Sequence, residues 1–257
     1  MTNPRQDKLI KLVIDKGYYT VEELAEKLDV STQTIRRDIK KLSEERLVIR
    51  HHGGASSPAS KTNLDYEVRK VSATEQKHAI GKAIADLIPD GSTVFITIGT
   101  TAEVIASHLA DKKNLQVITN SLRVANVLHN NKSIDVLIPS GKIKAFNGGI
   151  VGTEALDFIS HFRFDYLITS AASMDVDGTL LEYDLNETVI TQTVMKSARH
   201  VIIALDSSKF IPKGSIELGH IKEATYLFTD QPLSANLESV AKQGETEVKV
   251  CEPALAH

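Results

Sequence analysis

The chain has 257 residues, of which 42% are hydrophobic, and a formal net charge of −3 at pH 7. This length and apolar content suffice for one large and one small globular domain. The sequence lacks a run of 18 apolar residues and a secretory signal pattern, so we expect a cytoplasmic protein that does not enter a membrane. Its single cysteine, Cys251, excludes an intramolecular disulfide, and the sequence predicts no metal site and no cofactor.

The charge is unevenly distributed along the chain. Residues 1–54 hold eleven Lys or Arg and nine Asp or Glu, a net charge of +2, which leaves −5 for the remainder. Residues 30–55 alone hold six basic and three acidic residues. A basic end on an acidic body predicts two parts with different partners.

The first two predicted helices lie near the N-terminus. Apolar residues recur at helical spacing over 5–16, and Gly17 follows as a stop signal. Residues 20–28 begin with Thr20 and have Glu23 three residues later, the arrangement in which each side chain caps the other's free backbone amide. This pattern predicts a second, short helix.

A third helix follows after four residues, with Ser31 as its N-cap candidate. Its predicted inner face is formed by Ile35, Ile39 and Leu42, at positions i, i+4 and i+7. Helix, tight turn and helix is the helix-turn-helix pattern. Residues 47–55 then change to short apolar alternation and a Gly-Gly pair, which predicts a two-stranded wing.

The third helix has the residues that a DNA-reading helix needs. Short polar side chains at its start can reach base edges, and cations beyond them can contact phosphates. The candidates on the helix are Ser31, Thr32, Gln33, Thr34, Arg36, Arg37 and Lys40, and those on the wing are Arg50, His51 and His52. The alternative for the Arg pair is an ordinary solvated helix face. For the two histidines, a structural role and a contact with DNA remain equally open.

Composition sets the expected domain limits. Residues 57–73 are rich in Ser and polar residues without a sustained period, as is typical of a linker. We therefore expect a winged helix-turn-helix DNA-binding domain over residues 1–56, the linker over 57–73 and a sensor domain over 74–257.

From residue 74 onward, helical and strand-like segments alternate. The predicted helices are 75–88, 101–111, 121–130 and 186–198, and the predicted strands are 93–98, 115–119, 134–140, 166–170, 200–206, 225–230 and 248–251. Repeated strand-helix-strand units predict an α/β, Rossmann-like, mostly parallel sheet with helices on both faces.

Two loops of this domain have the features of an anion site. A strand expected to end at Ile98 is followed by Gly99, and then by Thr100 and Thr101 at the start of a helix. Helix N-termini favour anionic groups, and Gly allows close approach. The next strand is followed by Asn120 and Ser121 in the same way. Both loops would face one crevice at the carboxyl ends of the strands, although such residues also cap helices for local reasons.

The C-terminal third adds charged candidates. These are the acids Glu182, Asp184 and Glu187, which suit sugar hydroxyls, and Lys209, which suits a phosphate. The alternative is that all four are ordinary surface groups.

Residues 18–55 resemble the N-terminal domain of the DeoR family of bacterial transcriptional regulators, with a T-I-R-R-D-type helix and a wing ending in H-G-G. The resemblance runs through nearly the whole chain. It implies a sensor domain similar to sugar-phosphate isomerases, and its motifs fall on Gly99, Thr100, Thr101, Asn120, Glu187 and Lys209, with Gly141 and Lys144 at two further family positions. Several phrases, among them "FITIGTT" and "ITNSLRVA", resemble members that control sulfosugar breakdown, and the chain is also similar to members that control glycerol 3-phosphate use.

The chain departs from the family pattern at several positions. Thr97 stands where many members have Asp, Ser140 where they have Gly, and Lys144 where they have Arg. The basic residue expected after Glu187 is replaced by Thr191 or Gln192. These departures leave open whether the pocket still binds the family ligand.

The sequence thus predicts a repressor of a carbohydrate catabolic operon. Its expected partners are double-stranded operator DNA and an anionic sugar effector, either phosphorylated or sulfonated, with glycerol 3-phosphate as the alternative. Because one helix-turn-helix reads few base pairs, we expect a homodimer or homotetramer. Two other hypotheses are an active sugar-phosphate isomerase, for which a second catalytic group is missing, and a constitutive repressor with an empty pocket.

Overall fold

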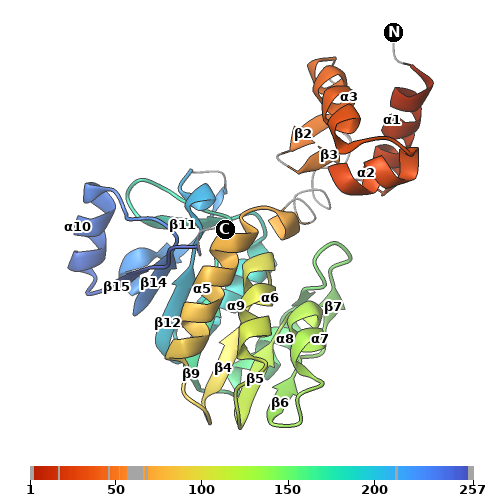
Figure 1. The fold of residues 1–257 in the computed structure, drawn as a ribbon. Helices are drawn as coiled ribbons and strands as arrows, with labels where there is room; N and C mark the ends of the chain where they lie inside the picture. The colour runs from red at the N-terminus through yellow and green to blue at the C-terminus, as the bar shows by residue number, and fades with distance from the viewer. Residues whose placement is uncertain are drawn as a thin grey trace. The chain divides into compact units, whose positions relative to one another are not determined.

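The computed structural model describes residues 3–16, 18–45, 47–51, 53–56, 66, 69–211 and 214–253. The chain divides into two compact units, Met1–Ser72 and Ala73–His257 (Figure 1). Each unit has a hydrophobic core of its own. The predicted fold class, a small helix-turn-helix domain followed by a parallel α/β sensor domain, is confirmed.

Between residues 3 and 56, the described part of the N-terminal unit has three helices and three short strands. They are α1 (Pro4–Lys16), β1 (Tyr18–Thr20), α2 (Val21–Leu28), α3 (Thr32–Glu44), β2 (Ile49–His51) and β3 (Gly54–Ser56). The predicted caps are present: Thr20 and Glu23 form the capping box of α2, and Ser31 caps α3. Leu9 of α1, Leu24 of α2 and Ile35 of α3 are fully buried in the common core.

The wing differs from the two-stranded prediction because β1 joins it. The sheet has the strand order β1-β3-β2, with all pairs antiparallel. Three residues before a capping box are too few to display a strand period, so β1 could not be read from the sequence. A Cβ on Gly54 would lie 2.2 Å from the carbonyl oxygen of Tyr19, so the close approach of β1 and β3 requires glycine at this position.

Helix α3 is held to α1 by a buried carboxylate. Asp38 is 5% exposed and accepts hydrogen bonds from Arg5 Nε at 2.6 Å and Gln6 Nε2 at 2.8 Å. Burial by itself would raise the pKa of Asp38, but the hydrogen bonds from Arg5 and Gln6 outweigh burial and lower this pKa. The acid of the T-I-R-R-D segment is therefore a structural anchor of α3.

Replacing Asp38 with Ala is expected to lower the free energy of unfolding of the N-terminal unit by about 2–3 kcal/mol, because a buried hydrogen bond to a charged group contributes about 1.5–3 kcal/mol. Since folding lowers the pKa of Asp38, its contribution is present at neutral pH and is lost as the pH falls through the folded-state pKa. Denaturant titrations at several pH values measure this. Glu44→Ala, which removes an exposed acid of the same helix, is the control, and equal losses for both variants would contradict the anchoring role.

The second unit contains a seven-stranded sheet of order β15-β14-β12-β9-β4-β5-β6, in which every neighbouring pair is parallel. The strands are β4 (Thr93–Ile96), β5 (Leu115–Thr119), β6 (Ile134–Leu137), β9 (Phe164–Thr169), β12 (Ala198–Ala204), β14 (Tyr226–Thr229) and β15 (Glu247–Val250). From β4 the chain runs in one direction to β5 and β6, and later fills the other side from β9 to β15. The strand order therefore reverses between β4 and β9.

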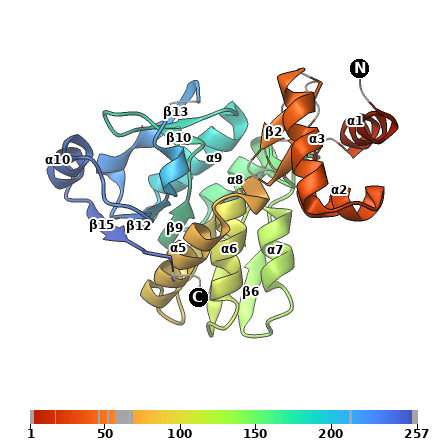
Figure 2. The same ribbon diagram turned by 45° about the horizontal axis from the view of Figure 1, so that its top comes forward.

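Six helices cover the two faces of this sheet. Helices α5 (Thr74–Leu87), α6 (Thr100–Leu109) and α7 (Leu122–Leu128) lie side by side on one face, as Figures 1 and 2 both show. Helices α8 (Thr153–Ser160), α9 (Leu185–Met195) and α10 (Ala235–Gln243) contribute to the separate core on the opposite face. None of the described helices combines the length and apolarity needed to cross a lipid bilayer.

The structure adds short elements that the sequence did not predict. They are the β7 (Lys142–Ile143) and β8 (Ile150–Val151) hairpin, the small antiparallel sheet of β10 (Ser173–Met174), β11 (Thr179–Glu182) and β13 (Ile216–His220), and the 3₁₀ turns η1 (Ser207–Lys209) and η2 (Ile221–Glu223). The prediction that a strand ends at Ile98 is wrong. β4 ends at Ile96, because the chain beyond it leaves its pairing with β5, although Thr97 N still donates to Ile168 O at 3.1 Å.

Candidate nucleic-acid interface and effector site

The outer face of α3 is polar and basic. Gln33, Arg36, Arg37 and Lys40 are all exposed, and their spacing of three, four and seven residues places them on one face of the helix. The opposite face is buried in the core. Because the core fixes the helix from behind, these four side chains are free to enter a DNA groove.

One of the predicted DNA-binding residues, Ser31, also caps the helix. Ser31 Oγ accepts from Thr34 N at 3.2 Å, and the two hydroxyls lie 2.9 Å apart.

Arg36 forms only a weak exposed ion pair, with its Nη2 3.9 Å from Glu22 Oε1 of α2. Arg36 is thus available to a phosphate or a base at little energetic cost.

In the wing, Arg50 is exposed and His51 is half-buried. His51 Nε2 is within hydrogen-bonding distance of Ser56 Oγ, at 2.7 Å, and its ring packs edge-on against Tyr18 at 5.8 Å between centroids. The third predicted wing residue, His52, lies outside the described residues. Arg50 is therefore the wing side chain whose geometry best suits a contact with DNA.

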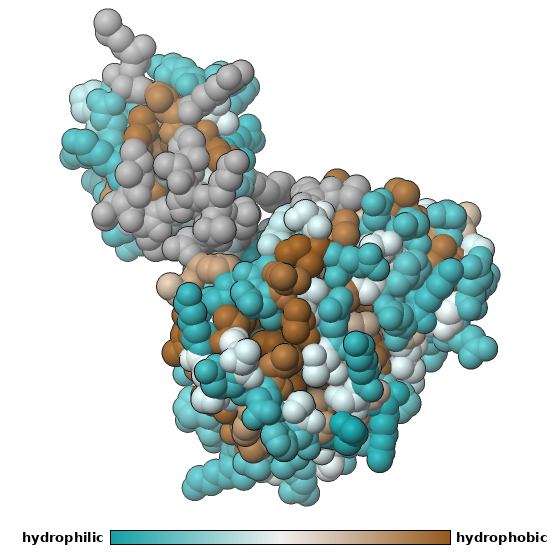
Figure 3. Space-filling model, turned by 180° about the vertical axis from the view of Figure 1, so that it is seen from behind, coloured by the Kyte–Doolittle hydropathy of each residue, from teal (hydrophilic) through white to brown (hydrophobic). Residues whose placement is uncertain are grey.

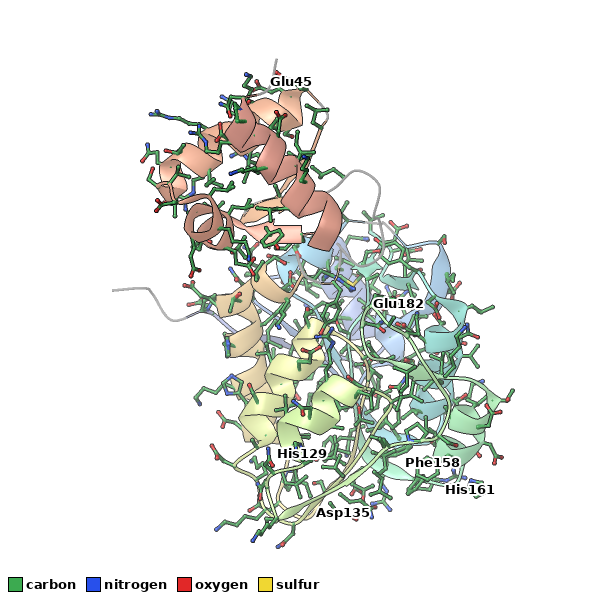
Figure 4. All side chains as sticks on the ribbon, turned by 90° about the vertical axis from the view of Figure 1, so that its right-hand side faces the viewer. Glu45, His129, Asp135, Phe158, His161 and Glu182 are labelled. Atoms are coloured by element: carbon green, nitrogen blue, oxygen red, sulfur yellow. The ribbon has the colours of Figure 1, made fainter. Side chains whose placement is uncertain are left out.

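In the second unit, polar residues converge where the strand order reverses. Thr97 follows β4, Asn120 follows β5, and Thr169 ends β9, so three neighbouring strands end at one place. These residues line a small cavity together with Ile98, Ser170, Glu182, Glu187 and Thr191. Figure 4 shows Glu182 at the end of this unit opposite to His129 and Asp135. Ligands of open parallel sheets bind at this kind of position.

One of the residues that line the cavity has a buried polar atom without a hydrogen-bond partner. Asn120 is 2% exposed, and its Nδ2 donates weakly to Ile150 O at 3.4 Å, but its Oδ1 has no hydrogen-bond partner. Such an atom costs about 1–3 kcal/mol unless a water or ligand supplies a donor. The orphan oxygen therefore favours a ligand that carries hydroxyl groups.

The N-terminus of α6 lies directly beyond Ile98. Gly99 is its N-cap, with φ of 146°, and provides no side chain to cap the helix. Thr100 and Thr101 follow in the first turn and are buried. The first-turn amides and the helix dipole thus make this end suitable for an anionic group.

The loop between β7 and β8 contacts Glu187, one of the acids that line the cavity. Lys144 Nζ contacts Glu187 Oε1 and lies 2.8 Å from Asp184 Oδ2, and Asn147 Nδ2 donates to Glu187 Oε1 at 2.9 Å. A Cβ on Gly149 would lie 2.4 Å from Ile98 Cδ1, so this loop approaches the end of β4 closely. The loop thereby places Lys144 and Asn147 against α9.

The ion pairs change the acid-base properties of this loop. Burial alone would lower the pKa of Lys144, but hydrogen bonds to Asp184 and Glu187 outweigh burial and raise it. Burial would raise the pKa of Asp184, whereas the hydrogen bonds from Lys144 and from the Glu187 amide lower it. At neutral pH, Lys144 and Asp184 are therefore both charged.

The cavity has a volume of about 20 Å³, which is room for about one water molecule. A sugar is several times larger. Entry of a sugar therefore requires the side chains around the cavity to move.

The structure brings most of the predicted effector residues together. Asn120, Glu182 and Glu187 line the cavity, and the α6 N-terminus, Lys144 and Asp184 adjoin it. Ser121 is buried and caps α7 through Val124 N. Gly141 and Lys209 are not among the described lining residues.

Several contributors were missed by the sequence analysis, because the β7–β8 loop was not predicted and the end of the predicted strand 166–170 was not proposed as part of the site. Asn147, Thr169 and Ser170 belong to this group. Of the two positions considered for the missing basic residue, Thr191 lines the cavity, while Gln192 Nε2 donates to Glu217 O and Leu218 O of β13.

Comparison with protein families covers both units. The model of the DeoR C terminal sensor domain matches residues 72–231, and that of the DeoR-like helix-turn-helix domain matches residues 5–61. The chain belongs to the DeoR family of transcriptional regulators. It is a transcriptional repressor of that family and not an enzyme.

Individual relatives match over nearly the whole chain. The DeoR-family protein is 46% identical to the HTH-type transcriptional repressor CsqR of Escherichia coli, over 96% of this chain and 94% of that one. It is 39% identical to the glycerol-3-phosphate regulon repressor of the same organism, over 96% of this chain and 98% of the relative. Among solved structures, ribose 5 phosphate isomerase A from Neisseria gonorrhoeae has a TM-score of 0.40 and 14% identity, covering 53% of each chain, which is too weak a likeness to indicate function.

The geometry explains two DeoR family motifs in physical terms. In the T-I-R-R-D segment, Ile35 and Asp38 are buried and hold the helix, while Arg36 and Arg37 face outward. In the H-G-G segment, Gly54 allows β3 to pack against β1. In the T-I-R-R-D segment, two residues thus build the domain, and the two arginines remain available for DNA.

Proposed function

We propose that this protein represses a carbohydrate catabolic operon and is controlled by an anionic sugar, phosphorylated or sulfonated, bound at the cavity between β4, β5 and β9. The proposed DNA-contacting residues are Ser31, Thr32, Gln33, Thr34, Arg36, Arg37, Lys40, Arg50, His51 and His52. The proposed effector residues are Gly99, Thr100, Thr101, Asn120, Ser121, Gly141, Lys144, Glu182, Asp184, Glu187 and Lys209.

The observation that carries the effector proposal is the unpartnered Asn120 Oδ1. Asn120 lines the same cavity as Glu182 and Glu187, and so does Ile98, which directly precedes the uncapped N-terminus of α6. The hydroxyl groups of a sugar can donate hydrogen bonds to Asn120 Oδ1 and to the carboxylates of the cavity. An anionic group on the sugar can bind at the positive end of the α6 dipole. The resemblance to members that control sulfosugar breakdown supports a sulfosugar, and the relative named for glycerol 3-phosphate supports that compound as the alternative.

Control by an effector requires that the ligand favour one of two arrangements of the protein. Coupling between two sites usually amounts to about 1–3 kcal/mol, so we expect a 5- to 150-fold change in operator affinity. Displacement of the Lys144 loop by a ligand is the proposed local event, because Lys144 and Asn147 contact Glu187, which lines the cavity.

We also propose a homodimer or homotetramer, which would place two recognition helices on repeated half-sites. Leu185 and Val189 of α9 support assembly through the second unit: both are apolar, exposed at 61% and 37%, and one turn apart. Figure 3 views the side opposite to Figure 1 and shows apolar side chains gathered on this unit.

Selection from fragmented genomic DNA at physiological salt, followed by sequencing, tests the DNA-binding part. Discrete peaks with repeated half-sites beside a sugar-catabolic operon are expected, and a featureless distribution would contradict sequence-specific binding.

Calorimetry of the full chain with glycerol 3-phosphate, fructose 6-phosphate and sulfoquinovose tests the effector. Saturable binding of at least one is expected, and binding of none would favour a constitutive repressor.

A further inference from the structure

A second pocket lies at the opposite end of the second unit from the effector cavity. It has a volume of about 390 Å³, within the range of about 300–1,000 Å³ that is usual for small-molecule sites. Arg163 precedes β9 and Ala198 begins β12, so this pocket lies where the two strands start, whereas the effector cavity lies where β9 ends. Figure 4 shows His161, the residue after α8, at the end of the unit opposite to Glu182. The described residues that line the pocket are Ser160, Arg163, Thr193, Lys196, Ser197, Ala198 and Arg199.

The two sites are too far apart to share one small ligand. Helix α9 lies between them, with Glu187 of its first turn at the effector cavity and Thr193 and its C-cap Lys196 at the second pocket. The rise along the helix from Glu187 to Lys196 is about 13 Å, at about 1.5 Å per residue. A ligand in the second pocket therefore occupies a site of its own.

Basic side chains dominate the lining of this pocket. Arg163, Lys196 and Arg199 are all exposed, and no acid is among the described lining residues. Arg199 is already neutralised, because its Nη1 lies 3.0 Å from Asp165 Oδ1. Arg163 donates only one long hydrogen bond, to Phe162 O at 3.4 Å, and neither Arg163 nor Lys196 has an ion pair in the described part of the chain. Two cations are thus left uncompensated by acidic side chains.

Two helix C-termini beside the pocket oppose an anion. Helix α8 ends at Ser160 and α9 at Met195, and each contributes a charge of about −0.5 at its C-terminus. Their sum of about −1 offsets only about half of the charge on Arg163 and Lys196. Stabilisation of helix ends therefore explains part of this basic group, and the pocket keeps a net positive charge.

Three hydroxyl groups indicate what else a ligand carries. Ser160, Thr193 and Ser197 each donate to the carbonyl oxygen of a residue three or four positions earlier, at 2.7, 2.8 and 3.2 Å respectively. Because these hydroxyl hydrogens are used within the helices, the hydroxyl oxygens can only accept further hydrogen bonds. Hydroxyl groups on a ligand supply the donors that these oxygens need.

We propose that this pocket is a second ligand site, separate from the effector cavity, which binds the phosphate monoester of a small molecule with several hydroxyl groups. The phosphate, with a charge of about −1.5 to −2 at neutral pH, lies between Arg163 and Lys196. The Arg163 guanidinium can form two parallel hydrogen bonds to phosphate oxygens, and Lys196 acts as a point charge. The assignment does not depend on which sugar controls the repressor.

Equilibrium dialysis of the full chain with fructose 6-phosphate as the probe tests the proposal. Thr100→Asp serves as the background, because a carboxylate there opposes anion binding at the N-terminus of α6 and lies outside the second pocket. In this background we expect saturable binding of fructose 6-phosphate and about ten-fold or weaker binding of fructose, which lacks the phosphate. No saturable binding, or equal binding of the two sugars, by a chain that still binds its operator overturns the proposal.

Two double variants in the same background localise the binding. Arg163→Gln with Lys196→Gln removes both charges and should weaken binding about ten-fold or more, whereas Arg163→Lys with Lys196→Arg keeps both charges and should retain most of the affinity. Because both side chains are exposed, thermal unfolding of the two variants should match the background chain.

Lys132→Gln, which removes one charge from an exposed position before β6, is the matched control and should leave the affinity unchanged. Full affinity in the double Gln variant places the binding elsewhere and overturns the proposal. Equal losses in the two double variants, or a loss in Lys132→Gln as large as that in the double Gln variant, also overturn it, because charge at this pocket would then not be the cause.

Discussion

Replacing Arg37 with Ala is expected to weaken operator binding by about 1–3 kcal/mol, the discrimination that one bidentate base contact provides. Arg37 is exposed on the outer face of α3, beside Gln33 and Lys40, and no described core residue depends on it. Fluorescence anisotropy with the operator and with a scrambled duplex, at one salt concentration, measures the loss and its specificity. Arg36→Ala should behave in the same way.

The control for this change is Lys11→Ala, which removes the same charge from an exposed position of α1. It should weaken both duplexes slightly and equally, because only the long-range charge changes. If Arg37→Ala affected the operator no more than Lys11→Ala does, the assignment of α3 as the recognition helix would fail. Thermal unfolding of both variants should match the parent chain.

The second large effect is expected from Thr100→Asp. Thr100 is 6% exposed in the first turn of α6, so a carboxylate there would occupy the positive end of the helix dipole and repel an anionic ligand. Effector affinity should fall at least 100-fold, while operator affinity without effector stays unchanged. Calorimetry and an operator-release assay measure the two quantities.

Thr100→Asn separates charge from shape, because Asn and Asp have nearly the same volume. The Asn variant should retain most of the effector affinity. An effector response equal to that of the parent chain in Thr100→Asp would move the anion site elsewhere in the unit. Equal losses in both variants would instead indicate a steric effect.

The sequence was sufficient to predict most of the regular part of the fold, but helices α8 and α10 were not predicted. Helix caps such as Thr20 and Ser31 are local hydrogen-bond patterns, and buried parallel strands are continuous apolar runs, so both leave a signal within a few residues. The three-residue strand β1 and the two-residue strands β7, β8 and β10 leave no such signal, because two or three residues are too few to show a strand period.

The same limit applies to the site. Asn120 and Glu187 were predicted because strand ends and the family motif mark them. The contact of Lys144 with Asp184 and Glu187 spans about forty residues of chain and depends on the unpredicted β7–β8 loop. Residue type and spacing could name these side chains as candidates, but only their arrangement in space shows that they neutralise one another.

The two faces of α3 are under different structural constraints. Ile35, Asp38 and Ile39 are constrained by the interior, whereas Gln33 and Arg37 are exposed. Substitutions on the outer face can therefore change which operator is read without an accompanying loss of stability. In the evolution of such repressors, a duplicated copy can acquire a new target by changing a few surface side chains, while the domain that presents them stays the same.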